Sequence, residues 1–165
     1  MNTKSWVLGQ LMIKIMILGC SGMLGQALYN ELKNDFELVG IDRVDIGQQH
    51  FIELDLTDKK ALETLINQFQ SEVIINCVAR VDLSSCEENP ELAHDIHVDL
   101  PNFLSQFEVY NVLISTDSVF DGKQGAYTER SRTNPLNMYA QTKCQGETAI
   151  LANGGLVIRT NIYGF

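Results

Sequence analysis

Three side chains in the second half of the chain are of types that move protons. Tyr139 and Lys143 stand four positions apart, a spacing that places both on one face of a helix. An ammonium about 5 Å from a phenol is worth roughly 3 kcal/mol at an effective dielectric near 20, which predicts a lowered Tyr139 pKa. Thr116 follows an apolar run, and its hydroxyl is expected to point at the same carbonyl oxygen as the phenol. The trio predicts proton donation to a developing alkoxide, although Thr116 alone also suits an ordinary strand end.

A glycine-rich loop supplies a candidate phosphate site early in the chain. Gly19, Gly22 and Gly25 form a G-x-x-G-x-x-G pattern between an apolar run and a helical stretch. Backbone N–H groups at such a helix start bind a pyrophosphate, and glycines allow its close approach. The spacing differs from the usual G-x-G-x-x-G, and a simple turn before a helix is the alternative interpretation.

An acidic residue strengthens the dinucleotide hypothesis. Asp42 follows the glycines by about twenty residues and ends the second apolar run, where a carboxylate accepts hydrogen bonds from the adenosine ribose. It would repel a 2′-phosphate, whereas the adjacent Arg43 would attract one. We therefore expect NAD(P)H as cofactor, with NADH favoured over NADPH.

These residues need a scaffold of parallel strands joined by helices. Short aliphatic runs alternate with helix-like stretches, which predicts an α/β fold with a Rossmann-type doubly wound parallel sheet. Most of the runs are too uniformly apolar to have a wet face. The predicted strands are 13–18, 37–41, 51–54, 73–77, 112–115 and 156–158, and the predicted helices are 23–33, 59–70, 90–107 and 137–151.

The predicted topology brings the candidate residues together. The carboxyl ends of parallel strands share one edge of the sheet, where such folds form their ligand crevice. We expect Gly19, Asp42, Asp55, Ala79 and Thr116 to meet there. A long polar segment, 121–135, is predicted as a functional loop.

Composition excludes several other classes of protein. Twelve basic against twenty-one acidic side chains give 12 − 21 = −9, so nucleic acid and acidic membranes are not expected partners. The four cysteines form no C-x-x-C pair, which indicates free thiols, no metal site and a cytoplasmic location. No apolar run is long enough to span a membrane. Residues 1–11 are expected to be a flexible leader, followed by a single domain over 12–165.

Five blocks of sequence resemble the extended short-chain dehydrogenase/reductases, in particular the dTDP-4-dehydrorhamnose reductase branch. The blocks are GCSGMLG at 19–25, DLTD at 55–58, NCVA at 76–79, STDSVFDG at 115–122 and PLNMYAQTK at 135–143. The resemblance implies hydride transfer from NAD(P)H to the C4 keto group of a nucleotide-linked deoxysugar, in deoxysugar or surface polysaccharide biosynthesis. A nucleotide-sugar is then the expected partner, with a homodimer left open.

The resemblance also implies a role for each matching residue. Tyr139 would donate the proton, Lys143 would hold the nicotinamide ribose, and Thr116 would hydrogen-bond the keto oxygen beside Asp117, a further substrate contact. The implied cofactor contacts, besides Tyr139 and Lys143, are Gly19, Gly22, Met23, Leu24, Gly25, Asp42, Asp55, Leu56, Cys77, Val78 and Ala79.

Departures from the family pattern keep other functions open. Ser118 replaces a tyrosine, His97 an asparagine of the fourth helix, and Ile162 a substrate-stacking tryptophan. Family members continue into a smaller substrate-binding domain, so this chain alone is expected to bind cofactor with little turnover. The alternatives are a regulatory subunit similar to the methionine adenosyltransferase beta subunit, and a nucleotide-sugar epimerase or dehydratase.

Overall fold

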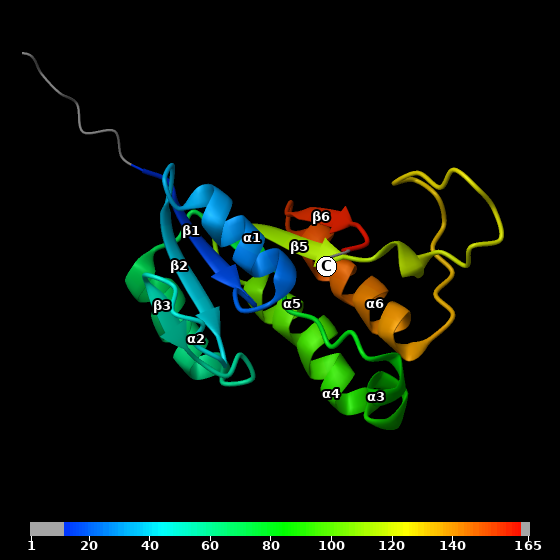
Figure 1. Ribbon diagram of the computed structural model, residues 1–165. Coiled ribbons are helices and arrows are strands. Elements are labelled where there is room, and N and C mark those ends of the chain that lie inside the picture. The colour runs from blue at the N-terminus through cyan, green and yellow to red at the C-terminus, as the bar shows by residue number, and fades with distance from the viewer. Residues whose placement is uncertain (1–11, 163–165) are drawn as a thin grey trace, which may run out of the picture.

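The protein is built on a six-stranded parallel sheet (Figure 1). The computed structural model describes residues 12–162, so the predicted leader at 1–11 lies outside the described residues. The strands lie in the order β3-β2-β1-β4-β5-β6, with β1 and β4 at the centre and β3 and β6 at the edges. Their bounds are β1 Lys14–Leu18, β2 Glu37–Asp42, β3 Phe51–Glu53, β4 Val73–Asn76, β5 Tyr110–Ser115 and β6 Leu156–Arg159.

Helices connect the strands and cover the sheet, except between β2 and β3, which an irregular segment joins. The α-helices are α1 Met23–Leu32, α2 Lys59–Phe69, α3 Leu83–Glu88, α4 Pro90–His94, α5 Leu100–Leu104 and α6 Met138–Ala152. A π-helical turn, η1 Asp95–Asp99, joins α4 to α5, and a 3₁₀ turn, η2 Asp117–Val119, follows β5. The predicted doubly wound α/β class is confirmed.

Alternating side chains of the central strands divide the core into two layers. Ile15 and Ile17 of β1 pack with Tyr29 of α1 on one face. Met16 and Leu18 pack on the other face, against α2 and α5. A buried central strand offers apolar side chains to both faces, and each fully buried aliphatic side chain contributes about 1.5–3 kcal/mol. The uniformly apolar runs of the sequence therefore became the buried strands.

The predicted helix over 90–107 is confirmed from Pro90 to Leu104, where α4, η1 and α5 follow one another without a break, but the π-helical turn within it was not predicted. Pro101 has no N–H, so the His97 carbonyl loses the donor that an α-helix would supply four residues later. Gly146 of α6 packs against this carbonyl, where a Cβ would lie 1.9 Å from the His97 oxygen. The π-helical turn thus lets two helices approach to backbone contact.

Sequence analysis missed α3, and its capping residue was the available signal. Asp82 accepts a hydrogen bond from the Ser85 N–H at 2.6 Å and so caps the start of the helix. The helix has only six residues, too few for a periodic apolar pattern to stand out.

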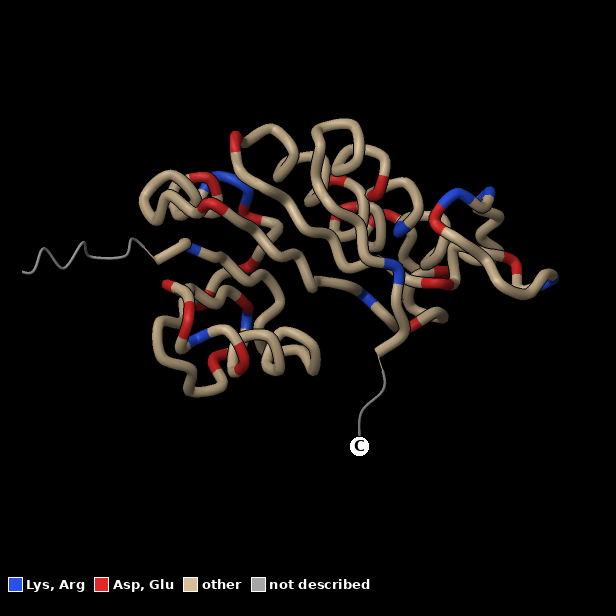
Figure 2. Tube along the Cα trace, turned by 90° about the horizontal axis from the view of Figure 1, so that it is seen from above, with Lys and Arg blue, Asp and Glu red and all other residues tan. Residues whose placement is uncertain are grey.

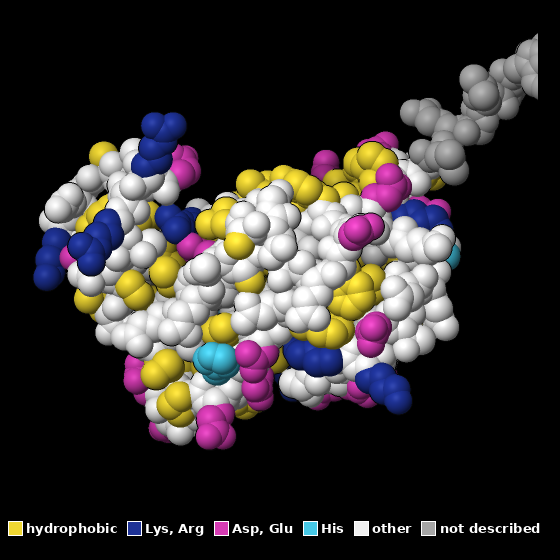
Figure 3. All heavy atoms as spheres, turned by 180° about the vertical axis from the view of Figure 1, so that it is seen from behind, with side chains coloured by type: hydrophobic (Ala, Val, Ile, Leu, Met, Phe, Trp, Pro, Cys, Tyr) yellow, Lys and Arg dark blue, Asp and Glu magenta, His cyan; other side chains and the backbone are white. Residues whose placement is uncertain are grey.

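The predicted loop 121–135 is irregular and projects from the body of the molecule (Figure 1). Lys123, Arg130 and Arg132 are exposed on it, and Figure 3 shows basic side chains gathered at this end. Acidic residues are instead spread along the whole trace (Figure 2). Within residues 12–162 no helix combines the length and the apolar character needed to cross a membrane.

We predict that Gly146→Ala lowers the free energy of unfolding by about 3 kcal/mol, because the new methyl group overlaps the His97 carbonyl. Urea unfolding measures the change. Gly125→Ala is the matched control: its Cβ meets no atom within 4 Å, so stability should change by less than about 0.5 kcal/mol. Equal effects of the two substitutions would contradict the close contact.

Candidate active site

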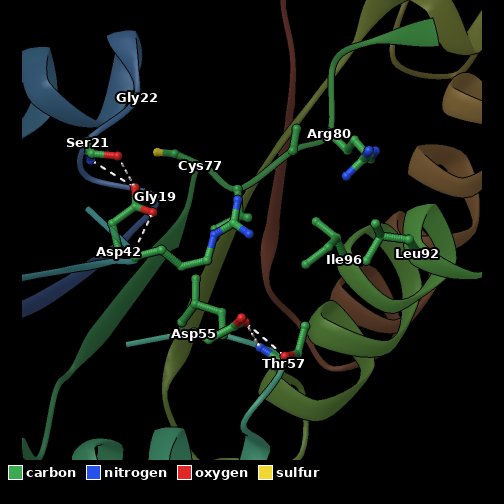
Figure 4. A pocket seen from close by; sticks show the side chains of 14 residues that line it. Gly19, Ser21, Gly22, Asp42, Asp55, Thr57, Cys77, Arg80, Leu92 and Ile96 are labelled. Atoms are coloured by element: carbon green, nitrogen blue, oxygen red, sulfur yellow. Dashed lines mark hydrogen bonds between the residues drawn. The ribbon is translucent and has the colours of Figure 1, made fainter. Parts of the chain in front are cut away.

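A cavity of about 490 Å³ opens at the carboxyl ends of β1, β2 and β4. Figure 4 shows the glycine loop and Asp42 on one side of it, and Leu92 and Ile96 projecting from the helical side. Its lining residues are Gly19, Ser21, Gly22, Asp42, Arg43, Asp55, Leu56, Thr57, Cys77, Val78, Ala79, Arg80, Leu92 and Ile96. The cavity therefore combines backbone, charged and apolar surfaces, as a dinucleotide requires.

Glycines shape the loop that forms the base of the cavity. Gly19 has a φ of +79°, and a Cβ there would lie 3.0 Å from the Val78 nitrogen. Gly25 packs against the same turn, where a Cβ would lie 2.2 Å from the Gly19 oxygen. Gly22 caps α1 without a side-chain hydrogen bond, so the first N–H groups of this ten-residue helix stay available to an anion.

Asp42 is fixed by the glycine loop. Its Oδ2 accepts hydrogen bonds from the Ser21 N–H at 3.0 Å and from the Ser21 hydroxyl at 2.6 Å. Its Oδ1 accepts one from the Arg43 N–H at 2.7 Å. The carboxylate is thereby held at the cavity, with the Arg43 side chain beside it.

The rest of the cavity lining combines an acidic side chain with apolar ones. Asp55 Oδ1 accepts hydrogen bonds from the Thr57 N–H at 2.9 Å and the Thr57 hydroxyl at 2.8 Å, which lower the Asp55 pKa. Leu92 and Ile96 stand one helical turn apart and face the cavity (Figure 4). A flat ring seated here would contact apolar surface beside a fixed acceptor.

Thr116, Tyr139 and Lys143 meet where β5 ends against α6. The Thr116 hydroxyl, as a hydrogen-bond donor to the phenol oxygen, lowers the Tyr139 pKa, but burial has the larger effect and raises it. The Lys143 amine is buried and donates to the Ile114 carbonyl at 2.6 Å. Burial lowers its own pKa to about 8.

The predicted lowering of the Tyr139 pKa by Lys143 is therefore wrong for the protein as it stands. The Lys143 amine is hydrogen-bonded to a main-chain carbonyl, and burial has the largest effect on the Tyr139 pKa, which it raises. Sequence spacing gave the shared helix face but not the depth of burial.

Two residues connect this group to the cavity. Cys77 lines the cavity and lies within the electrostatic reach of Lys143, while burial raises the thiol pKa to about 12. His97 is buried, its ring meets the Tyr139 ring edge-on at 5.4 Å, and its Nε2 accepts a hydrogen bond from the Arg80 N–H at 2.9 Å. The cavity-lining Arg80 and the Tyr139 ring thus contact the same His97 side chain.

His97 also ties these parts to α6. Its Nδ1 lies 2.8 Å from the Thr142 hydroxyl, which donates to carbonyls of its own helix. These partners assign a neutral ring with the proton on Nδ1. Burial, followed by the charges of Lys143 and Arg80, lowers the His97 pKa to about 3.

Most of the cofactor contacts predicted from sequence lie around one cavity, and some do not. Met23, Leu24 and Gly25 belong to the first turn of α1 but are not among the lining residues, and neither are Thr116, Tyr139 and Lys143. Asp117 opens η2 and borders a separate groove toward β6. Sequence analysis did not identify five of the lining residues: Ser21, Thr57, Arg80, Leu92 and Ile96. The only usable signal was the four-residue spacing of Leu92 and Ile96, which places them on one helix face.

Comparison with known proteins identifies the family. The model of the RmlD substrate binding domain matches residues 13–164. The chain belongs to this family. It is 34% identical over 159 residues to methionine adenosyltransferase 2 subunit beta of Bos taurus, covering 92% of this chain and 47% of that protein. It is 30% identical to dTDP-4-dehydrorhamnose reductase of Aggregatibacter actinomycetemcomitans, covering 91% and 51% respectively.

Solved structures share the architecture. A hypothetical dTDP-4-dehydrorhamnose reductase from Sulfolobus tokodaii superposes with a TM-score of 0.83 at 36% identity, over 89% of this chain and 55% of that one. The Bacillus anthracis dTDP-4-dehydrorhamnose reductase, solved in complex with NADP, shares the fold with a TM-score of 0.78 at 23% identity, over 90% and 52%. The chain thus spans about half the length of the proteins it matches.

Because His97 resists protonation when folded, it should make stability depend on pH. The unfolded chain binds a proton near the ordinary histidine pKa of 6.5 and the folded chain only near 3, so this contribution is full above about pH 6.5 and is lost as pH falls. Between about pH 7.5 and pH 5 we expect a loss of about 2 kcal/mol from His97, measured by urea unfolding.

His97→Asn should remove that part of the pH dependence, since asparagine does not titrate. The exposed His50 offers a matched control, because His50→Asn should keep the pH dependence of the unmodified chain. If His97→Asn lost stability on acidification as steeply as the unmodified chain does, the neutral assignment would be wrong.

Proposed function

We propose that this chain is the NAD(P)H-binding part of a reductase that acts on the 4-keto group of a nucleotide-linked sugar, in deoxysugar or surface polysaccharide biosynthesis. One observation carries the proposal: a cavity floored by the glycine loop lies beside Thr116, Tyr139 and the buried Lys143, and Cys77 and His97 connect the two. Similarity to dTDP-4-dehydrorhamnose reductases supports the choice of substrate class.

The cavity has the donor set that a dinucleotide needs. The free N–H groups at the start of α1 and the bare glycines would receive the pyrophosphate. Asp42 would accept hydrogen bonds from the adenosine ribose, and the adenine would lie between Asp55 and the apolar Leu92 and Ile96. The cofactor supplies the hydride, and these residues hold it in place.

Proton delivery falls to Tyr139. Burial keeps the phenol protonated, so it is ready to donate as negative charge develops on the substrate oxygen. The Thr116 hydroxyl stands beside it as a second hydrogen-bond partner for that oxygen. The Lys143 ammonium has three N–H donors, so it would donate to the nicotinamide ribose while keeping its bond to the Ile114 carbonyl.

The cofactor choice depends on two neighbours. Asp42 favours NADH because a carboxylate bonds ribose hydroxyls and repels a 2′-phosphate. Arg43 lines the same cavity and would attract that phosphate. Because Asp42 is anchored by three hydrogen bonds, we propose that NADH binds more tightly than NADPH.

A regulatory role is the second candidate, and one observation favours it. The chain is as similar to methionine adenosyltransferase 2 subunit beta as to the reductases. Such a protein would bind cofactor and a protein partner without turning over a sugar. An epimerase or dehydratase remains a weaker alternative, since a solved UDP-Glc/GlcNAc 4-epimerase shares only the fold at 21% identity.

We predict that the chain binds NADH and that Asp42→Asn weakens binding about tenfold, through loss of charge-assisted bonds to the ribose. Fluorescence titration with NADH and NADPH measures both affinities. Asp45→Asn is the control, because Asp45 is exposed and bonds only the nearby Gly47 N–H in its own turn. If neither coenzyme bound, the proposal would fail.

Turnover separates the reductase from the regulatory subunit. We would fuse residues 1–165 to the C-terminal half of the Aggregatibacter actinomycetemcomitans reductase and assay a dTDP-4-keto-6-deoxy sugar with NADH. The chain alone should turn over poorly and the fusion well, because the second half would exclude water and orient the sugar. Tyr139→Phe should slow the fusion about 10²- to 10⁴-fold with NADH affinity nearly unchanged. Cofactor binding without turnover in the fusion would favour the regulatory role.

A further inference from the structure

A buried ion pair, Glu147 with Arg159, lies one helical turn beyond Lys143 on α6. Glu147 of α6 is 2% exposed, and its Oε1 accepts a hydrogen bond from the Ser115 hydroxyl at 2.5 Å. The Arg159 guanidinium of β6 binds the same carboxylate through two nitrogens, Nη2 to Oε2 at 2.6 Å and Nε to Oε1 at 3.0 Å. Nothing in the proposed reaction uses these groups.

Arg159 is itself braced from the far side. Its guanidinium lies over the Phe120 ring at 5.2 Å, and Phe120 stacks on Tyr127 at 4.5 Å with an interplanar angle of 9°. A buried carboxylate is costly unless it is paired and hydrogen-bonded, and here it is both. The carboxylate is therefore held in one place by three elements: β5, β6 and α6.

Three contacts join one face of α6 to the end of β5. The α6 residues Tyr139, Lys143 and Glu147 stand at four-residue spacing, so they share a face. Their partners are the three consecutive β5-end residues: the Thr116 hydroxyl, the Ile114 carbonyl and the Ser115 hydroxyl, respectively. A displacement at Glu147 would be felt one turn away at the lysine.

We propose that Glu147, fixed by Ser115 and Arg159, is a positioning residue that keeps the buried Lys143 amine protonated and seated at the end of β5. The relevance to catalysis rests on the proposed function, whereas the effect on Lys143 itself does not.

Charges around Lys143 agree with this role. Burial lowers the Lys143 pKa, and the Glu147 carboxylate opposes this more than any other group. The Cys77 thiol on the β4 side stays neutral, because burial raises its pKa to about 12. Two further titratable groups face Lys143 from the described residues, the neutral His97 of η1 and the Tyr139 phenol one turn earlier. Arg159 is paired with Glu147, and because it lies farther from the Lys143 amine, its positive charge cancels only part of the attraction between the carboxylate and the amine.

The test measures the Lys143 ionisation directly, without cofactor. NMR titration of the chain carrying ¹³C at the lysine ε-carbons follows each amine, and Lys143→Arg identifies the resonance. Glu147→Gln should lower the Lys143 pKa by about one unit or more, because the favourable charge is lost and Arg159 remains. Glu37→Gln is the matched control: it also removes a glutamate from an ion pair, with Lys14 at 3.3 Å, but on β2. It should leave the Lys143 pKa unchanged.

A second variant guards against misfolding of the first. Glu147→Gln with Arg159→Met removes both charges, avoids an unpaired guanidinium and should still lower the Lys143 pKa, since the acid is the nearer group. An unchanged Lys143 pKa in whichever variant folds would overturn the proposal. Failure of NADH to bind would instead defeat the proposed function and leave this result standing.

Discussion

Three consecutive residues at the end of β5 hold one face of α6, and the candidate chemistry depends on that contact. The Ile114 carbonyl takes the lysine amine and the Ser115 hydroxyl takes the Glu147 carboxylate. These contacts require α6 to lie close against β5 and η1. Gly146 makes this possible, because it packs on the carbonyl that Pro101 leaves free in η1. The contact between η1 and Gly146 thus helps to set the position of Tyr139 on α6.

The cavity and the candidate catalytic residues are connected through the side chains that lie between them. Arg80 and Cys77 line the cavity, while His97 and Lys143 stand behind them beside the tyrosine. Polar groups buried this deeply persist because each has a partner: a neutral histidine between two hydrogen bonds, and a lysine on a carbonyl. The interior between the sheet and α6 therefore holds polar groups that are hydrogen-bonded to one another, while the layers around β1 are apolar.

Much of the fold could be predicted because parallel strands leave a strong local signal. The aliphatic runs at β1, β2 and β4 are buried on both faces, so their residues are apolar without alternation. The π-helical turn in the segment after Pro90 was not predicted, although Pro101 was a local signal for it. The contact of this turn with Gly146, some fifty positions along the chain, leaves no local pattern. Leu92 and Ile96 share a helix face by their spacing, but only the tertiary structure turns that face toward the cavity.

By itself the sequence determined the order of strands and helices, the glycine turn before α1, and the one-face spacing of Tyr139 with Lys143, because each follows from local geometry. Tertiary structure alone decided the ionisation of these groups. The Lys143 pKa falls and the Tyr139 pKa rises because both are withdrawn from water. Desolvation depends on everything packed around a side chain, including Ile114 of β5 beside the lysine and His97 of η1 beside the tyrosine. Spacing along a helix fixes which groups are neighbours, and the surrounding fold fixes their charge.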